Sequence, residues 1–275
     1  MTRKHSTQIL MTTFFLMIAA AAHAQGNYEI QVYGSETQEK RTTMIELHSN
    51  FTFEGTKVTT DGTYPTYHAL HETLEITQGF NDWFETGFYI FTSAREGQGW
   101  QWVGSHVRPR FRIPEKWHWP VGLSLSQEFG YVRAKFSPDT WTWEIRPIMD
   151  KQMGRWYVAF NPALDRSWHG PSVSHGMIFS PGARVTYDVT KKIAIGTEYY
   201  GSLGPVTGFD PLRDQQQQLF FTMDLNVSPK WEINLGPGVG MTQATDHFIL
   251  KCIVGRRFSW SRGKKKENPV ETAKP

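Results

Sequence analysis

Residues 43–53, TMIELHSNFTF, alternate between apolar and polar side chains. Ile45 and Leu47 fall on one face of an extended chain, and Glu46 and His48 fall on the other. Successive side chains of a β-strand point to opposite faces, whereas an amphipathic helix repeats every 3.6 residues or so. The stretch therefore predicts a β-strand with one apolar and one polar face.

The same period of two recurs from about residue 42 to residue 258. Each segment has about 9–14 residues, the length that a tilted strand needs to cross a bilayer. The sequence therefore predicts an all-β fold, an antiparallel transmembrane β-barrel of about 12 strands. The predicted strands are 42–55, 67–78, 83–93, 100–113, 119–133, 140–151, 155–165, 176–188, 192–201, 216–227, 230–241 and 246–258.

The connections between these segments alternate in length. Short joints such as GFND at 79–82 contrast with long linkers such as DRSWHGPSVSHG at 165–176. This asymmetry is typical of outer-membrane barrels, which have short periplasmic turns and longer extracellular loops. A soluble β-sandwich or lipocalin-like barrel is the alternative, since it also has period-two strands. Strand length, loop asymmetry and aromatic residues at strand ends favour the membrane barrel. These aromatic residues include Trp83, Trp100, Trp117, Trp141, Trp156 and Trp231.

Composition narrows the function classes. Only 39% of the 275 residues are hydrophobic, which excludes a helical membrane protein, while 14% are aromatic. One cysteine excludes an intramolecular disulfide framework and any multi-thiolate metal site. The formal net charge of +3 is too small to indicate nucleic-acid binding. We expect no cofactor and no metal.

The N-terminus predicts export. Residues 1–24 contain Arg3 and Lys4, then an apolar run, then Ala22-His23-Ala24, as in a secretory signal peptide. We expect this segment to be removed and the mature protein to lie in the cell outer membrane. The remaining expected parts are an N-terminal periplasmic segment at 25–41, the barrel at 42–258 and a basic, disordered tail at 259–275.

Several residues conflict with regular strands. Prolines fall inside five predicted strands, where they remove ladder hydrogen bonds, so we expect bulges or strand ends there. Glu72 shares its face with Leu70 and Leu74, which predicts a bulge or a shifted boundary. The five prolines are Pro109, Pro147, Pro162, Pro181 and Pro237.

Three stretches carry a family resemblance. HETLEITQGFNDWFETGFYIFTS at 71–93, WTWEIRPIMDKQMGRWYVAFNP at 141–162 and EYYGSLGPVTGFDP at 198–211 resemble Gram-negative outer-membrane proteins of the MetA-pathway-of-phenol-degradation family. The resemblance implies a barrel and uptake of aromatic or other small apolar compounds. A last strand ending at Phe258 further resembles the strand that the barrel assembly machinery reads, although a basic tail follows it here.

The polar face of the predicted barrel holds the candidate functional residues. Three arginines alternate along one strand, and we expect carboxylates of neighbouring strands to pair with them. Such charges can form a constriction that selects solutes, or a network that only fills the lumen. The lumen and selectivity candidates are Arg108, Arg110, Arg112, Glu85, Glu128, Glu144, Arg146, Glu46 and His48.

An enzyme is another function for such a barrel, because twelve-stranded outer-membrane phospholipases exist. The fragment Glu46-Leu47-His48-Ser49-Asn50 contains both a histidine and a serine. Adjacent residues of a strand point to opposite faces, so His48 and Ser49 cannot exchange a proton directly. We expect no catalytic residues. The sequence favours a passive channel or transporter for small molecules, with outer-membrane lipid and small solutes as partners and no nucleic acid. A structural or adhesive barrel whose loops bind a partner is the alternative, and a lipid-modifying enzyme is less favoured.

Overall fold

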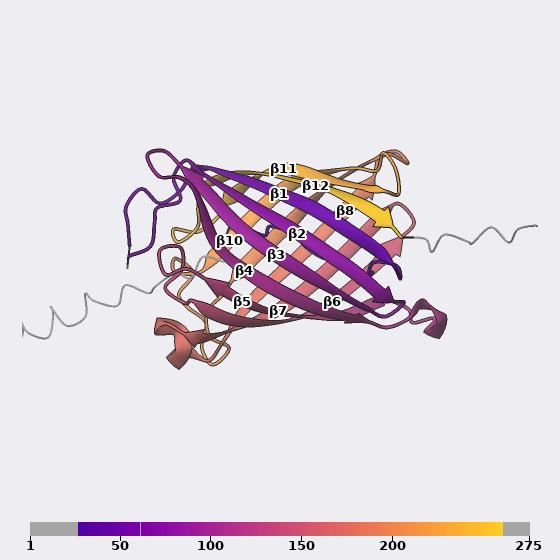
Figure 1. Cartoon of the computed structure of the whole chain (residues 1–275), viewed down its shortest axis with the longest axis horizontal. Coiled ribbons are helices and arrows are strands. Elements are labelled where there is room, and N and C mark those ends of the chain that lie inside the picture. Colours follow the sequence, from indigo (N-terminus) through magenta and orange to yellow (C-terminus); the bar gives the residue numbers. More distant parts are fainter. Residues whose placement is uncertain (1–26, 61, 261–275) are drawn as a thin grey trace, which may run out of the picture.

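The computed structural model describes residues 27–60 and 62–260 and forms a closed antiparallel barrel (Figure 1). The predicted signal peptide and nearly all of the predicted tail lie outside the described residues. Two short 3-10 helices, η1 (Glu115–Trp117) and η2 (Pro171–His175), lie in connections. The strands are β1 (Thr42–Glu54), β2 (Ala69–Asn81), β3 (Phe84–Arg95), β4 (Gly99–Arg112), β5 (Gly122–Val132), β6 (Trp141–Met153), β7 (Trp156–His169), β8 (Met177–Asp188), β9 (Ile193–Ser202), β10 (Gln216–Leu225), β11 (Trp231–Gly240) and β12 (Phe248–Ser259).

Each strand pairs with the next along the chain, and β1 pairs with β12 to close the barrel. The seam runs from the pair Thr42–Ser259 to the pair Glu54–Phe248. Closure leaves no unpaired strand edge, which is the condition for a sheet to cross a bilayer. The predicted twelve-stranded antiparallel barrel is therefore confirmed. Among the described residues, no helix is long and apolar enough to span a membrane.

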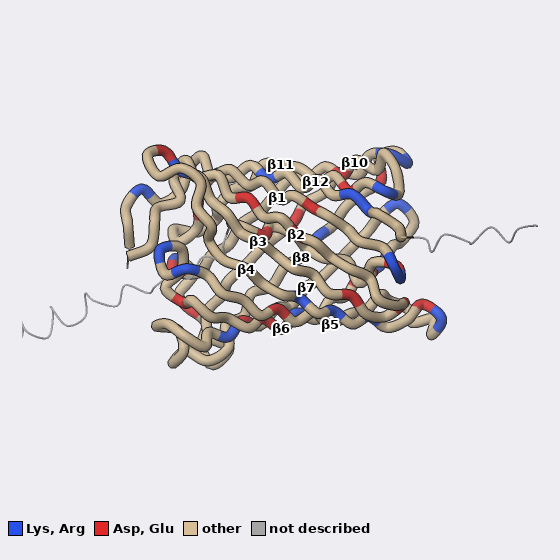
Figure 2. The backbone as a smooth tube through the Cα atoms, viewed as in Figure 1, with Lys and Arg blue, Asp and Glu red and all other residues tan. Residues whose placement is uncertain are grey.

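The two faces of the wall differ as the alternation predicts. On β1, Glu46 and His48 are buried in the lumen, whereas Ile45 and Leu47 are 39% and 45% exposed on the outside. An apolar outer face with a polar interior is the arrangement of a membrane barrel and the reverse of a soluble sandwich. Charged side chains of several strands, including Glu75, Arg108 and Lys251, are accordingly buried in the lumen. Other charged residues lie at the two ends of the barrel (Figure 2).

The in-strand prolines interrupt hydrogen bonding but do not shift the strands. The ladder between β10 and β11 resumes in the same register on either side of Pro237, and that between β6 and β7 does so around Pro147 and Pro162. The register shifts that occur among the described strands lie elsewhere, for example between Gly79 and Asn81. The expectation of bulges at the prolines was wrong, because an outward-facing proline costs ladder bonds without adding a residue.

Glu72 is a carboxylate on the outer face of a regular strand. The pairing of β1 with β2 runs in one register past this position, so the expected bulge is absent from this ladder. Ser49 lies opposite on β1, and its hydroxyl donates a 2.8 Å hydrogen bond to Glu72 Oε2. The neighbouring strand therefore satisfies one oxygen of this group.

The two ends of the barrel carry different connections. We call the end bearing residues 55–68, 96–98, 133–140, 170–176, 203–215 and 241–247 the loop end. The opposite end, called the turn end, bears 82–83, 113–121, 154–155, 189–192 and 226–230. The turn-end connections are mostly the shorter ones, with two exceptions: 113–121 at the turn end is long and contains η1, and 96–98 at the loop end is short.

Candidate functional site in the barrel lumen

Residues 27–38, here called the lumen segment, run through the interior of the barrel from end to end. At the loop end, the Asn27 amide donates to Thr52 Oγ1 at 3.2 Å and also bonds Asp246. At the turn end, the Gln38 backbone N–H donates to Glu85 Oε2 at 2.6 Å. We expected residues 25–41 to lie in the periplasm, and the described residues differ from that expectation because 27–38 lie inside the barrel.

The lumen segment belongs to no strand, so wall side chains satisfy its backbone. The amide of Asn161 on β7 accepts a 2.8 Å hydrogen bond from Tyr33 N–H and donates a 2.9 Å bond to Tyr33 C=O. Arg110 donates to the carbonyl of Gly34 at 3.2 Å, and Lys251 donates to that of Ile30 at 3.0 Å. Buried backbone groups must be paired, and here side chains replace a neighbouring strand.

Apolar side chains of the lumen segment pack on one side of the wall. Ile30 and Val32 form a buried cluster with four wall residues on β7, β9, β10 and β12. These wall residues are Ala159, Tyr200, Phe220 and Ile249. Apolar burial of this kind stabilises the segment in place by about 25 cal/mol per Å² of surface removed from water.

A network of ion pairs lies between β2, β3 and β4. Arg108 Nη2 lies 2.6 Å from Glu75 Oε1 and 3.7 Å from Glu85 Oε1, and Arg110 Nη2 lies 2.6 Å from the same Glu85 oxygen. The Arg108 guanidinium also lies over the ring of Tyr33, 4.5 Å from its centroid. All four charged groups are nearly inaccessible to solvent, so each depends on the others for its stability.

The other candidate carboxylates pair differently from the prediction. Glu128 bonds His106 on β4, and Glu144 pairs at 2.6 Å with Arg146 on its own strand. Arg112 pairs at 3.1 Å with exposed Glu115 in the following turn. The expected arginine ladder bridged by Glu85, Glu128 and Glu144 was therefore wrong for the last two. The imidazole of His106 occupies the space where a Cβ on Gly130 would lie, which brings it beside Glu128.

A second charged network lies on the opposite wall. Lys251 on β12 bonds Glu198 on β9, and both side chains are completely buried. Arg184 on β8 contacts Glu198 at 3.6 Å and also pairs with Asp224 on β10. These residues were not among the candidates, although the alternation of their strands places them on the inner face.

Two cavities remain around the lumen segment. The loop-end pocket has a volume of about 200 Å³ and combines aromatic residues with several carboxylates. Its lining includes Tyr28, Phe91, Val132, Phe136, Glu29, Glu128, Glu144 and Asp165. The turn-end cavity is larger, about 730 Å³, and is lined by both charged networks. Its lining includes Glu46, Glu75, Glu85, Arg108, Arg110 and Arg184.

Aromatic and basic side chains gather beside the loop-end pocket. Tyr64 meets Phe136 edge to face at a centroid distance of 5.4 Å, and Arg95 lies 5.1 Å from the Phe136 ring. Lys135 donates a hydrogen bond that lowers the pKa of the half-buried Tyr64 phenol. These contacts hold the ring of Phe136, which lines the pocket.

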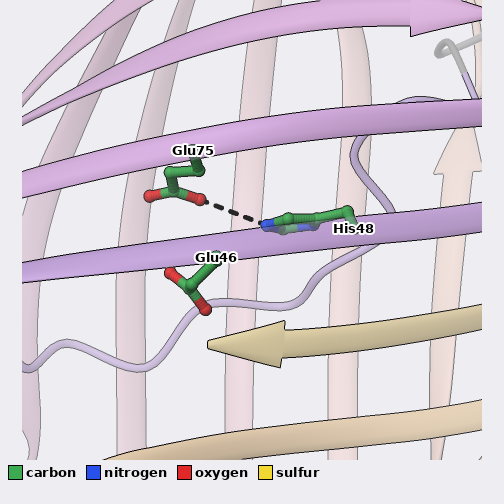
Figure 3. A group of neighbouring side chains, drawn as sticks. All are labelled: Glu46, His48 and Glu75. Carbon is green, nitrogen blue, oxygen red and sulfur yellow. Dashed lines mark ion pairs between the residues drawn. The ribbon is translucent and has the colours of Figure 1, made fainter. Parts of the chain in front are cut away.

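The histidine–serine fragment has the geometry expected from the alternation. His48 is buried in the lumen, and Ser49 points outward to Glu72. His48 instead lies beside two carboxylates, Glu46 and Glu75, in a cluster shown in Figure 3. Glu75 was missing from the candidates, although its position two residues from Thr77 and Thr73 marks it as inward-facing.

The lumen segment is the main feature that the sequence did not reveal. Tyr28, Ile30 and Val32 do alternate with Glu29 and Gln31, which was the signal available. That pattern predicts an extended chain with two unlike faces. It does not indicate that the chain would lie inside a barrel.

Comparisons with known proteins give structural likeness only. No protein-family model matches the chain, and no curated protein matches it. Solved structures similar to it include the KdgM porin, with a TM-score of 0.49 and 10% identity, covering 79% of this chain and 99% of that one. The NanC porin has a TM-score of 0.49 and 10% identity, covering 78% of this chain and 100% of its own. The outer-membrane protein Omp33 of Acinetobacter baumannii has a TM-score of 0.46 and 9% identity, with coverage of 82% and 100%.

Proposed function

We propose that the protein is an outer-membrane channel for passive movement of small molecules, closed in the described state by the lumen segment. The observation that carries the proposal is a closed barrel with a polar interior, divided into two cavities by a chain segment that is not a strand. In this orientation the loop end faces the exterior and the turn end faces the periplasm.

The size of the barrel supports a channel that the lumen segment closes. Barrels of about eight strands are filled by their own side chains, whereas those of about 16 strands hold an open aqueous channel. Twelve strands fall between these limits, and here the remaining space is partly taken by residues 27–38. Movement of this segment toward either end joins the two cavities into one path.

The segment is held by contacts that can be exchanged for water. Most of its backbone bonds go to wall side chains rather than to a strand, including those from Asn161, Arg110 and Lys251. Each such bond contributes about 1 kcal/mol net, because water replaces it on opening. The apolar contacts of Ile30 and Val32 oppose opening and keep the closed state dominant.

The loop-end pocket supports a solute class. Its volume of about 200 Å³ exceeds the ~150 Å³ that holds one benzene ring in an engineered cavity. Its carboxylates outnumber its arginines, which disfavours anionic solutes. We propose that neutral or cationic single-ring aromatic compounds enter here. The resemblance to the phenol-degradation family has the same implication, and membership of that family stays a prediction.

A reversible clamp on the lumen segment tests the channel function. A Cβ on Gly122 of β5 would meet the Asp150 carboxylate and the hydroxyl oxygen of Ser35. Once the Asp150 side chain turns aside, Ser35→Cys with Gly122→Cys places two thiols within bonding reach. The variant is built on Cys252→Ser to remove the single natural thiol. Current through planar bilayers is then recorded under oxidising and reducing conditions.

We expect the reduced protein to conduct and the oxidised protein to close, with reductant restoring the current. Cys252→Ser with Ser35→Cys alone is the control, and its current should not respond to redox conditions. No conductance in any state would contradict the channel function. Equal conductance in the oxidised and reduced double variant would contradict gating by the lumen segment.

A further inference from the structure

The lumen cluster of Glu46, His48 and Glu75 follows from the strand register. Glu46 and His48 are two residues apart on β1 and therefore share its inner face. Glu75 on β2 lies directly opposite Glu46 in the ladder. One donor atom from each residue falls within 4.8 Å of the other two. Figure 3 shows the three side chains.

Four polar atoms of this cluster lack hydrogen-bond partners among the described residues. Neither ring nitrogen of His48 has one among the described residues, and neither do Glu46 Oε1 and Glu75 Oε2. His48 Nε2 and Glu75 Oε2 lie 3.3 Å apart as an ion pair, drawn as a dashed line in Figure 3, without forming a hydrogen bond. All three residues are at least 95% buried. Buried polar groups without partners are costly, and a cation between them would satisfy all three at once.

We propose that these three residues bind one divalent transition-metal ion of the zinc class. Imidazole and carboxylate donors suit zinc, with bonds of about 2.0–2.2 Å and hence donor separations near 3.4 Å in a tetrahedral site. The His48–Glu75 pair already has such a separation, at 3.3 Å. Rotation of the Glu46 carboxylate, whose Oε1 is unpartnered, completes the set.

Arg108 supports this role of Glu75. The guanidinium holds Glu75 Oε1 at 2.6 Å and leaves Oε2 facing His48. An outer partner that fixes the second oxygen of a carboxylate ligand is common around bound metals. In the surrounding network, the carboxylates of Glu46, Glu75 and Glu85 outnumber the guanidiniums of Arg108 and Arg110. Among the described residues, Glu46 is the one of these three carboxylates without an ion pair, which leaves it available to a cation.

The turn-end cavity gives the ion a route. Glu46 and Glu75 both line this cavity of about 730 Å³, so an ion can reach them without crossing the lumen segment. Three protein donors leave a fourth position open toward the cavity, as in zinc sites that also hold water. The metal site does not rest on the proposed channel function, because the cavity is present with the segment in place.

Metal binding is measured on the full-length mature protein in detergent after chelator treatment and dialysis. Cobalt(II) absorption and zinc competition should show one ion per chain. His48→Gln and Glu46→Gln each remove one donor while preserving side-chain size. Each should weaken binding by at least about 100-fold, because loss of even an outer partner costs 10–100-fold. His71→Gln is the matched control, since His71 is also buried in the lumen and unpartnered but lies outside the cluster. This variant should bind like the wild type.

Two results would overturn the metal site. The first is wild-type protein that takes up no ion after chelator removal. The second is a His48→Gln variant, folded by its heat-modifiable migration, that binds like the wild type. X-ray absorption of the zinc-loaded wild type decides without any variant: one imidazole with carboxylate oxygens supports the site. Two or more imidazoles would assign the ion to surface histidines and overturn the proposal.

Discussion

The loop-end pocket and the turn-end cavity are bounded by the same alternating wall, yet they differ in chemistry. Tyr28, Phe91 and Phe136 give the first an aromatic lining, whereas Arg108 and Glu85 give the second a lining of ion pairs. The lumen segment differs in the same way, from Tyr28 and Ile30 at one end to Glu36 and Gln38 at the other. The side chains of the lumen segment therefore resemble those of the wall beside them, aromatic and apolar at the loop end and polar or charged at the turn end. The loop-end pocket thus fits the proposed entry of aromatic solutes, and the turn-end cavity fits the proposed metal ion.

The largest expected effect comes from breaking the turn-end network with Arg108→Met. Removing one partner leaves Glu75 and Glu85 buried without their main counter-charge, which costs about 3–5 kcal/mol of unfolding free energy. The urea midpoint, followed by tryptophan fluorescence in detergent, measures the loss. Arg112→Met on the same strand is the control, because its partner Glu115 is exposed and the pair contributes less than about 1 kcal/mol. An equal fall in the urea midpoint of both variants would mean that the turn-end network is as hydrated as the exposed pair of Arg112 and Glu115.

A smaller effect, on the fraction of open channels, is expected from weakening the lumen segment where it separates the two cavities. Asn161→Leu removes both hydrogen bonds to the Tyr33 backbone, about 2 kcal/mol in total, which raises the open fraction about 30-fold. Single-channel recording measures the open fraction. Asn234→Leu is the matched control, since Asn234 bonds only the wall side chains Glu198 and Asp224. Similar opening in both variants would show that Asn161 does not hold the segment.

Phe136→Ala tests the aromatic lining of the loop-end pocket. Loss of about 40 Å² of apolar contact with a bound ring costs about 1 kcal/mol, or about fivefold in affinity. Block of the ionic current by benzyltrimethylammonium, added on the loop side, measures this affinity. Tetramethylammonium provides the comparison, and its block should not change. A loss of block for both cations would point to a general disturbance of the loops.

The smallest expected effect concerns charge selection. Asp165→Asn removes one carboxylate of the loop-end pocket and should lower the preference for potassium over chloride by less than about twofold. The reversal potential in a salt gradient reports the change. Asp82→Asn, in the exposed turn between β2 and β3, should leave the reversal potential unchanged. An increase in cation preference in Asp165→Asn would contradict the proposed role of the pocket carboxylates.

The wall could be predicted from the sequence because its determinants are local. A period of two places Glu46, His48 and Arg108 on one face regardless of what lies opposite them. Pairing partners depend on register, which strand patterns do not determine. Arg110 faces Glu85 on one side and Ser126 on the other, while Glu128 bonds His106, so the expected pair with Glu85 formed and those with Glu128 and Glu144 did not.

The lumen segment could not be predicted for a different reason. Its backbone partners come from residues far apart in the chain, such as Asn161 and Lys251. A strand ladder has a regular sequence signature, but a backbone satisfied by scattered side chains has none. In the cluster of Glu46, His48 and Glu75, periodicity places all three side chains on the inner face, whereas the position of Glu75 opposite Glu46 depends on the register.

The position of the lumen segment constrains the order of folding. The segment adjoins β1, which forms the closing seam with β12, the last strand of the chain. A bulky, hydrogen-bonded chain is difficult to thread into a barrel that has already closed. The segment is therefore enclosed most easily when the first and last strands meet, so that the sheet wraps around its own N-terminus. The lumen segment then serves as a template inside the forming barrel, and the pairing of β1 with β12 is the step that encloses it.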